Sequence, residues 1–531
     1  MITSEEPKRL ATIKEASQWA SELLKRDVSE SNISYLVQYG KVRKRNGNGA
    51  TLVDLSDLRS YYQSYVGKRE SHWKKRLGND LNWALSFDHL REKDTTKHVH
   101  RLHPYKGKFI PQLVEYFIDE HTDNFKKEVY FKPGDIILDP FSGSGTTLVQ
   151  ANEMGIRAIG VDISRFNSLI AEVKLLDYHF KSVEEDARKI RLCITGYEAD
   201  NKIAAFDAEL SAKLSEFNDR YFPGYEFKYR AQNGGVDEDK YAREKEKEFL
   251  KIYTILVAKY GVELKQGANN SFLDKWYIRS VRREIDYALG IIEGIKNAKS
   301  KKVLTVVLSR TIRSCRATTH SDLATLKDPQ LTTYYCYKHK KICKPLFSIK
   351  SWFERYTVDT VDRLKAFARL KSNARFAVVT ADARTVDLTK EIAKKDETFY
   401  EMIKREKVAG IFTSPPYVGQ IDYHEQHAYS YDLFGFERND EKEIGPLSKG
   451  QGKEARNEYV QGVSTVLNNS KRFLKNGYNI FLVANDKYNL YPTIAEKSDT
   501  KIVNQYRRPV LNRTERDKGA YSEIIFHLKA K

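Results

Sequence analysis

A small polar residue, two prolines and an aromatic ring follow a short apolar run in the last quarter of the chain. The run covers residues 408–412, and directly after it come Thr413, Ser414, Pro415, Pro416 and Tyr417. Proline fixes its own φ and lacks an amide donor, so the carbonyl groups around Pro415 and Pro416 are held outward as acceptors. Tyr417 offers a flat face on which a planar heterocycle can stack. Such a turn suits holding an exocyclic amino group that must act as a nucleophile, although a strand ending in a proline-rich turn has the same pattern.

A second segment has the pattern of a nucleoside-binding unit. Residues 135–147 predict a buried strand that ends near Asp139 and leads into a turn containing Gly143 and Gly145. A helix follows, and then a second strand that ends on Asp162. The glycines let the backbone approach a ligand closely. An acid about 20 residues beyond such a loop can accept hydrogen bonds from ribose hydroxyls.

This loop differs from two other common nucleotide-binding loops. The dinucleotide fingerprint has three glycines, and the P-loop ends in Lys followed by Ser or Thr; the segment has neither pattern. A carboxylate at the strand end, Asp139, would repel phosphate but can accept a hydrogen bond from an α-ammonium group. The segment therefore favours S-adenosylmethionine over NAD or ATP.

Taken together, these segments resemble the amino-group DNA methyltransferases, which methylate N4 of cytosine or N6 of adenine. Residues 139–145 look like the cofactor loop of that family, and residues 413–417 look like its catalytic motif. Residues 103–113 are similar to the segment that closes over the methionine end of the cofactor, and residues 379–383 to the third strand, whose acid contacts the adenine. The resemblance implies these cofactor-binding residues: Tyr105, Asp139, Phe141, Gly143, Ser144, Gly145, Asp162 and Asp382.

The resemblance also implies a fold. We expect a Rossmann-like, S-adenosylmethionine-dependent methyltransferase of the α/β class, with a mostly parallel sheet and helices on both faces. Residues 85–175 would form its cofactor-binding half and residues 371–531 its catalytic half. Residues 1–70 would form an N-terminal helix-turn-helix module, and residues 176–370 a large helical insertion that is the candidate target-recognition region.

The predicted chemistry is methylation of an amino group, and the predicted catalytic residues are Ser414, Pro415, Pro416 and Tyr417. The amino nitrogen of cytosine is a poor nucleophile because its lone pair is delocalised into the ring. The Ser414 hydroxyl and the Pro415 carbonyl could accept its two hydrogens and free that lone pair, so that catalysis is mostly positioning and electrostatics. The base must leave the duplex to be reached, and Tyr417 would stack on it through its ring face.

Within the resembling family, serine at position 414 favours N4 of cytosine, and no Pro-Cys nucleophile of the carbon-5 cytosine enzymes is present. Three alternatives stay open at this point. They are an N6-adenine DNA methyltransferase, an RNA amino-methyltransferase, and a DNA-binding regulator with an inactive cofactor fold. A cognate restriction endonuclease is the further partner that the resemblance suggests.

Composition is consistent with a partner that carries phosphates. The chain has 531 residues and a formal net charge of +19, an excess expected of a protein that follows a DNA backbone. It has four cysteines, too few for a disulfide scaffold, which fits a reducing cytoplasm. The first residues lack a signal-peptide pattern, and no apolar run has the length of a membrane span. We therefore expect duplex DNA as partner, no membrane, and a cytoplasmic location.

The N-terminal residues predict a small winged module. Thr12 and Glu15 can form a capping box at the start of a first helix, and a second helix is followed by a basic strand, a hairpin turn, a return strand and a third helix. This order resembles the winged helix-turn-helix modules of excisionases and MerR-like regulators. The resemblance would place these side chains at the DNA: Ser31, Asn32, Tyr35 and Gln38 in the major groove, Arg43 and Arg45 along the backbone. A helical hairpin that packs on the catalytic domain has the same pattern.

The insertion predicts mostly helices, with one apolar run at residues 303–308 that we interpret as a buried strand. Arg310, Arg313 and Arg316 follow that run at threefold spacing. They could contact phosphate or guanine, or they could lie at a solvated helix end.

Three residues of the insertion have the spacing of metal ligands. Cys336, His339 and Cys343 follow one another as Cys-x2-His-x3-Cys, with Cys315 and His320 as possible further ligands. Structural zinc sites usually have two close ligand pairs, and the second pair is missing here. We therefore predict ordinary buried thiols and no metal.

Overall fold

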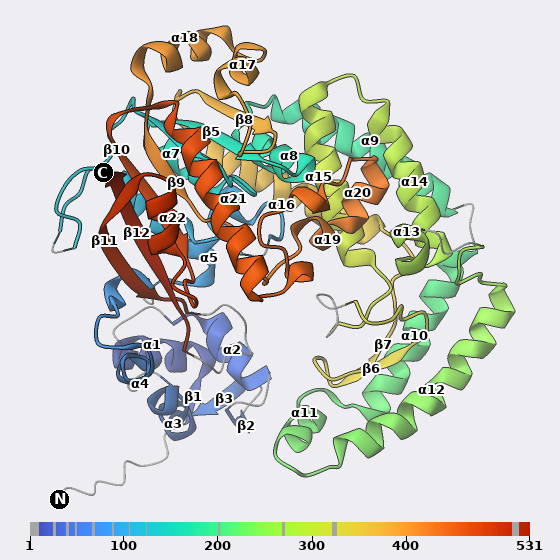
Figure 1. The fold of residues 1–531 in the computed structure, drawn as a ribbon. Coiled ribbons are helices and arrows are strands. Elements are labelled where there is room, and N and C mark those ends of the chain that lie inside the picture. The colour runs from blue at the N-terminus through green and yellow to red at the C-terminus, as the bar shows by residue number, and fades with distance from the viewer. Residues whose placement is uncertain are drawn as a thin grey trace, which may run out of the picture.

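The computed structural model describes residues 10–24, 28–38, 42–47, 50–65, 69–87, 90–105, 107–123, 125–199, 202–267, 271–320, 326–511 and 520–531. At its centre lies a seven-stranded sheet with the order β11-β12-β10-β9-β4-β5-β8 (Figure 1). The strands are β4 (Ile136–Asp139), β5 (Arg157–Asp162), β8 (Phe376–Thr380), β9 (Val408–Thr413), β10 (Leu474–Ala484), β11 (Thr500–Pro509) and β12 (Ser522–Ala530). The predicted α/β fold class is confirmed by this sheet.

Five neighbouring strands of the sheet are parallel. β10, β9, β4, β5 and β8 pair in that order, whereas β12 is antiparallel to both β10 and β11. In the register, Leu138 of β4 lies opposite Ile411 of β9, and Asp139 of β4 lies opposite Gly160 of β5. Since the carboxyl ends of parallel strands meet at one edge, Asp139 and Asp162 are brought to the same edge as the turn after β9.

Helices cover both faces of the sheet because alternate residues of each buried strand face opposite sides. Ile137 packs with the helices of one face, whereas Ile136 and Leu138 pack with those of the other. The first face carries α6 (Pro111–Ile118), α7 (Thr146–Glu153) and α8 (Arg165–Leu175). The second carries α17 (Leu388–Ala393), α18 (Glu397–Glu406), α21 (Lys453–Lys471) and α22 (Tyr491–Lys497).

The N-terminal residues form the predicted order of elements. These are α1 (Ile13–Leu24), α2 (Glu30–Gln38), β2 (Lys44–Gly47), β3 (Ala50–Asp54) and α3 (Leu55–Tyr65), preceded by an unpredicted strand, β1 (Leu10–Thr12), which pairs with β3. The capping box is present: the Glu15 amide donates to Thr12 Oγ1 over 3.2 Å, and the Thr12 amide donates to Glu15 Oε2 over 2.8 Å.

The N-terminal module has a small apolar core of its own. The segment after it, α4 (Arg69–Leu77) and η1 (Trp83–Ser86), attaches it to the sheet edge, where Arg507 of β11 donates to the Leu77 carbonyl over 2.7 Å. Two further short helices, α5 (Glu92–Thr95) and η2 (His98–Arg101), lead to α6.

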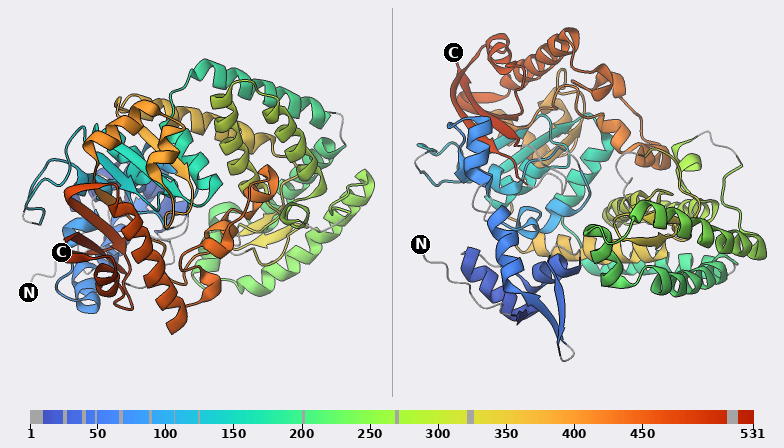
Figure 2. Two further views of the ribbon diagram at one scale, coloured as in Figure 1. Left: turned by 45° about the horizontal axis from the view of Figure 1, so that its top comes forward. Right: turned by 90° about the horizontal axis from the view of Figure 1, so that it is seen from below.

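The insertion is an arc of helices beside the sheet (Figures 1 and 2). It contains α9 (Phe180–Ala199), α10 (Ile203–Tyr221), α11 (Gly224–Gln232), α12 (Glu238–Tyr260), α13 (Phe272–Trp276), α14 (Arg279–Glu293), α15 (Ala298–Cys315), the hairpin β6 (Tyr334–Cys336) and β7 (Lys341–Cys343), and α16 (Lys350–Ala368). The predicted strand at 303–308 is wrong, because these residues lie in α15. That helix is packed among α8, α9, α14, α16 and α20 (Ala428–Phe434), and a helix buried on most sides has the continuous apolar run of a buried strand. Among the residues described, no helix combines the length and apolar character of a membrane span.

Candidate active site

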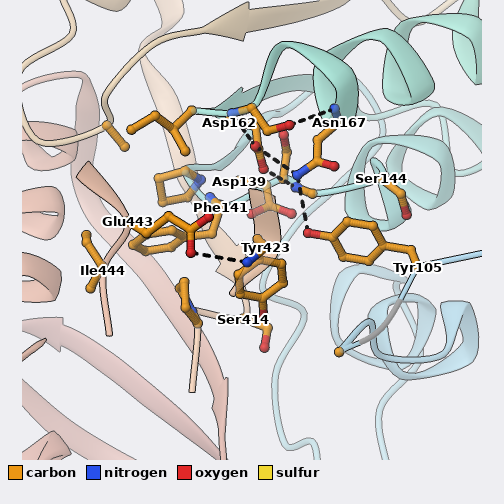
Figure 3. A pocket seen from close by; sticks show the side chains of 18 of the residues that line it. Tyr105, Asp139, Phe141, Ser144, Asp162, Asn167, Ser414, Tyr423, Glu443 and Ile444 are labelled. Carbon is orange, nitrogen blue, oxygen red and sulfur yellow. Dashed lines mark hydrogen bonds between the residues drawn. The ribbon is translucent and has the colours of Figure 1, made fainter. Parts of the chain in front are cut away.

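A pocket opens where β4, β5, β8 and β9 end, and most of the predicted site residues lie around it (Figure 3). Its lining includes these predicted residues: Tyr105, Asp139, Phe141, Gly143, Ser144, Asp162, Asp382, Ser414 and Pro416. In the close view, Asp162 and Asn167 lie on one side, Ser414 lies on the other, and Asp139 and Phe141 lie between them. Residues from 85–175 and from 371–531, the two predicted halves of the domain, therefore line one pocket.

Asp162 organises the glycine-rich turn. Its two carboxylate oxygens accept hydrogen bonds from the amides of Gly143 and Ser164, each over 2.8 Å, and Asn167 donates to it over 3.1 Å. Gly143 has φ of +48°, and a Cβ placed there would lie 3.0 Å from the Tyr105 hydroxyl. The turn can thus have this shape beside Tyr105 only because residue 143 has no side chain.

Gly145 has a different task from Gly143. It does not line the pocket. With φ of +79°, a Cβ on it would lie 2.8 Å from Cβ of Ala171 on α8. Gly145 therefore allows the turn to pack closely on α8, and it lies behind the pocket lining.

Asp139 is buried at the end of β4 and joins the two halves of the chain. Its Oδ1 accepts a hydrogen bond from the Thr413 hydroxyl of β9 over 2.5 Å and another from the Phe141 amide over 3.1 Å. Burial raises the pKa of Asp139 to about 6, although these hydrogen bonds oppose the rise. The carboxylate is therefore ionised at neutral pH but close to protonation, which suits a group awaiting a cationic partner.

The pocket contains buried polar atoms that lack a protein partner. Ser142 Oγ, Ser144 Oγ, Asn167 Oδ1 and His424 Nε2 all belong to lining residues and make no hydrogen bond within the described structure. Buried polar groups are normally satisfied, so these atoms are suited to a polar ligand. Together with two acids and an aromatic ring, this donor and acceptor set fits the ribose, ammonium and carboxylate groups of S-adenosylmethionine.

Asp382 lies at the pocket but already has a partner. Arg384, two residues further on, donates to both of its carboxylate oxygens, over 2.6 Å to Oδ2 and 2.9 Å to Oδ1. Burial would raise the pKa of Asp382, and these hydrogen bonds nevertheless hold it below its ordinary value. A contact of this acid with an adenine amino group would share the carboxylate with Arg384.

The turn after β9 places Ser414 and Pro416 at the pocket, but Pro415 is buried and Tyr417 lines neither the pocket nor the neighbouring cleft. The Tyr417 hydroxyl donates to Glu523 Oε1 of β12 over 2.8 Å, and the nearby Ser414 side chain opposes the rise in the Tyr417 pKa that burial causes. Arg508 of β11 lies 3.2 Å from the other oxygen of Glu523. The hydroxyl of Tyr417 thus belongs to a polar network with Glu523 and Arg508 close to Ser414, a role that the ring-face prediction did not include.

Sequence reasoning missed the segment that closes the pocket from the side of α19 (Tyr423–Gln426). The amides of Tyr423 and His424 donate to Glu443 over 3.1 and 2.7 Å, and the His424 ring contacts the same carboxylate. The Tyr105 ring stacks near that of Tyr423, with centroids 6.0 Å apart. The position of Tyr423 shortly after the catalytic motif was the available signal, but its pairing with Glu443 has no sequence pattern.

A cleft of about 1180 Å³ adjoins the pocket, and Tyr105 and Lys108 line both. Arg310, Arg313 and Arg316 all face this cleft. The other arginines that line it are Arg355 and Arg363 of α16 and Arg101. Arg310 is buried and donates to Asp359 over 2.5 Å and to Thr360 over 2.6 Å. The alternative of a solvated helix end is therefore wrong for Arg310.

The segment of residues 103–113, which precedes and enters α6, is hydrogen bonded to the insertion at this cleft. His103 shares a hydrogen bond with Ser309 of α15 over 3.1 Å, and Ser309 shares another with Ser430 of α20 over 2.8 Å. The insertion, the segment before α6 and the segment after the catalytic turn therefore meet at one buried point.

The proposed DNA contacts of the N-terminal module are only partly described. Among those residues, Arg43 makes two hydrogen bonds of 2.8 Å to Asp57 at the module surface. The side chains of Ser31, Asn32, Tyr35, Gln38 and Arg45 lie outside the described part of the structure.

Comparison with known proteins gives one full-length match and several local ones. The chain is 46% identical over 526 residues to the Type II methyltransferase M.MjaII of Methanocaldococcus jannaschii. The matched region covers 98% of this chain and 97% of that protein. It is 34% identical over 113 residues to the Type II methyltransferase M.MvaI of Kocuria varians, covering 21% of this chain and 23% of that protein. Over 94 residues it is 33% identical to the Type II methyltransferase M.BsoBI of Geobacillus stearothermophilus, covering 17% of each. The model of a DNA methylase family, of the N6/N4 class, matches residues 12–172.

Proposed function

This chain belongs to the amino-group (N6/N4) DNA methyltransferases, a family that uses S-adenosylmethionine, and on that premise we propose that it methylates N4 of cytosine in duplex DNA. The observation that carries the proposal is the position of Ser414. Its side chain faces the same pocket as Asp139, Gly143 and Asp162. A methyl donor held by those residues would lie beside the one side chain that, within the family, is associated with cytosine.

In this proposal the glycine turn and the two buried acids hold the cofactor. S-adenosylmethionine supplies an electrophilic methyl group when it is bound. Asp162, whose carboxylate is fixed by the amides of Gly143 and Ser164, accepts from the ribose hydroxyls. Asp139 accepts from the ammonium group, which would favour its ionised form. Ser142 and Ser144 provide the unpartnered hydroxyls for the remaining polar atoms.

Ser414 and the Pro415 carbonyl then act on the amino group of the target base. Each would accept a hydrogen bond from one amino hydrogen, which draws the nitrogen toward tetrahedral geometry and exposes its lone pair; the one proton that the nitrogen must lose after methylation would pass to solvent. The Tyr417 hydroxyl lies near the Ser414 side chain, and its hydrogen bond to Glu523 fixes its position. Tyr417 follows β9, Glu523 lies on β12 and Arg508 lies on β11, and their contacts fix these side chains in advance. The groups therefore need little rearrangement when the base enters.

The arginine-lined cleft is the proposed path of the DNA. A duplex must present its target base to a pocket at the edge of the sheet, and a base reaches such a pocket only by leaving the stack. The cleft leads to that pocket past Tyr105 and Lys108, and its basic side chains come largely from the insertion. This supports a role of residues 176–370 in holding the target, with the N-terminal module as a second candidate contact. A cognate endonuclease would be a separate protein that cuts the same site when it is unmodified.

Methyl transfer from labelled S-adenosylmethionine tests this proposal. Unmethylated genomic duplex DNA, single-stranded DNA and structured RNA would be compared as substrates. We expect transfer to duplex DNA, loss of transfer in Ser414→Ala, and parent-like transfer in the control Ser211→Ala, which alters an exposed serine on α10. Preferred labelling of RNA, or a fully active Ser414→Ala variant, would contradict the proposal. No transfer to any of the three substrates, with cofactor binding also absent, would indicate an inactive DNA-binding protein.

A further inference from the structure

Two histidines and two cysteines converge at one end of the β6–β7 hairpin. His320 follows α15, Cys336 ends β6, His339 lies in the turn and Cys343 ends β7. One nitrogen or sulfur atom from each residue lies within 4.8 Å of the corresponding atoms of the other three. Cys336 Sγ is 3.6 Å from His320 Nδ1, and Cys343 Sγ is 3.6 Å from His339 Nδ1.

These separations can be compared with those around a tetrahedral zinc ion. Zinc binds thiolate sulfur at about 2.3 Å and imidazole nitrogen at about 2.0–2.1 Å. At a tetrahedral angle, a sulfur and a nitrogen on the same ion are then about 3.6 Å apart. Both sulfur–nitrogen pairs of the cluster have this separation before any ion is added. We propose that His320, Cys336, His339 and Cys343 bind one structural Zn²⁺ ion.

The chemistry of the four ligands decides which kind of metal site this is. Two thiolates balance the charge of Zn²⁺, and sulfur with imidazole nitrogen is a set that zinc prefers and that Mg²⁺ or Ca²⁺ does not. Four protein ligands complete a tetrahedron and leave no position for water or substrate. The site is therefore structural, and it lies in the insertion, apart from the pocket that contains Ser414.

The two faces of the hairpin are held differently. Its strands have three residues each; Tyr335 and Ile342 are buried in the main core of the insertion, whereas Tyr334, Cys336 and Cys343 form a small separate cluster. Asn218 of α10 anchors one edge by two hydrogen bonds to the backbone of Ile342, of 3.0 and 2.9 Å. An ion that joins both strands, the turn and the segment after α15 would hold the face of the hairpin that carries the small separate cluster, because the main core and Asn218 hold the other face.

His320 supplies the ligand that the sequence pattern lacked. It lies 16 positions before Cys336, outside the Cys-x2-His-x3-Cys run, and the fold brings it to the hairpin. Cys315, the other candidate, is buried at the end of α15 and is not a member of the cluster. The Tyr334 hydroxyl lies 2.8 Å from His320 Nδ1 and 3.1 Å from the His320 amide. With zinc on Nδ1, that nitrogen would no longer accept from the hydroxyl, which would keep the His320 amide as its donor and hold the backbone at His320.

Metal analysis and thiol mapping on the unaltered full chain test the site without relying on a variant. The protein would be produced with added zinc under reducing conditions, and its zinc content measured by mass spectrometry after desalting. We expect one zinc ion per chain. We also expect a chelator to raise the alkylation of Cys336 and Cys343 together, by about tenfold or more, because a bound thiolate is protected, while Cys193 stays unchanged.

Variants and cobalt give independent outcomes. Cys336→Ser and His320→Gln should lose the zinc, whereas the control Cys193→Ser should retain it. Replacement of zinc by Co²⁺ should give the thiolate charge-transfer absorption of a tetrahedral site. The proposal is overturned if the unaltered chain is free of zinc and fails to take up Co²⁺, if Cys336→Ser retains the metal, or if Cys336 and Cys343 are found as a disulfide in the reduced preparation.

Discussion

Replacement of Asp139 by asparagine should make the cofactor-free protein more stable and yet unable to bind its cofactor well. Burial raises the pKa of Asp139 from its ordinary value of 3.8 to about 6. Because each pH unit of pKa difference corresponds to about 1.36 kcal/mol, the ionised carboxylate costs the folded protein about 3 kcal/mol. Asparagine carries no charge and can keep the donors of Asp139, the Phe141 amide and the Thr413 hydroxyl, on its oxygen.

The sign of the pH dependence follows from which state holds the proton. Between its ordinary pKa of 3.8 and about 6, Asp139 is protonated in the folded protein and ionised in the unfolded chain. The stability of the parent therefore falls as the pH rises through this window, and the full cost is present above it. We expect Asp139→Asn to be more stable than the parent by up to about 3 kcal/mol at neutral pH, and by much less near pH 4.

The assay pairs denaturant unfolding without cofactor, at those two pH values, with calorimetric titration of S-adenosylmethionine. Cofactor affinity should fall strongly in Asp139→Asn because the acceptor of the ammonium charge is lost. In the parent it should fall about tenfold per pH unit below pH 6. Asp362→Asn, an exposed site on α16, is the control and should change neither quantity. Two results would refute this reasoning. One is unaltered cofactor affinity in Asp139→Asn; the other is a difference in unfolding free energy between variant and parent that is the same at both pH values.

Three other perturbations separate the parts of the site. Gly143→Ala should lose cofactor affinity by calorimetry, because its Cβ would lie 3.0 Å from the Tyr105 hydroxyl at a left-handed φ; unchanged affinity would contradict the role of the turn. Tyr417→Phe should lower kcat about tenfold, about 1.4 kcal/mol in the barrier, with unchanged cofactor affinity, since the hydroxyl that Glu523 Oε1 fixes near Ser414 is lost; parent-like turnover would leave only the ring face as its function. Arg313→Ala should reduce the salt dependence of DNA binding by about one in the log–log slope, and an unchanged slope would remove this arginine from the DNA path.

The parts of the fold that sequence could predict are those with a local pattern. β4, β5 and β9 are short apolar runs that end in a polar turn, and each was expected where it lies. β11 was missed because it is an edge strand with mostly polar residues, such as Asn504 and Gln505, and only part of it is buried. The run at 303–308 was misread because periodicity disappears when a helix is buried on most sides.

The site residues that escaped prediction act through contacts between distant segments. Glu523 meets Tyr417 only because β12 lies beside β10 in the sheet, and Glu443 reaches Tyr423 and His424 from a loop about 20 residues away. His320 reaches Cys336 through the end of α15. Such pairs have no fixed spacing, so they become visible only when the chain is folded.

Identification of the modified nucleoside decides whether this chain methylates N4 of cytosine. Duplex DNA methylated by the purified chain would be digested to nucleosides and separated by mass spectrometry, with the Ser414→Ala variant processed in parallel as a blank. We predict N4-methylcytosine as the product in the parent sample and its absence in the blank. N6-methyladenine as the product would overturn the assignment of the base, and 5-methylcytosine would contradict the whole mechanism of direct transfer to an amino group.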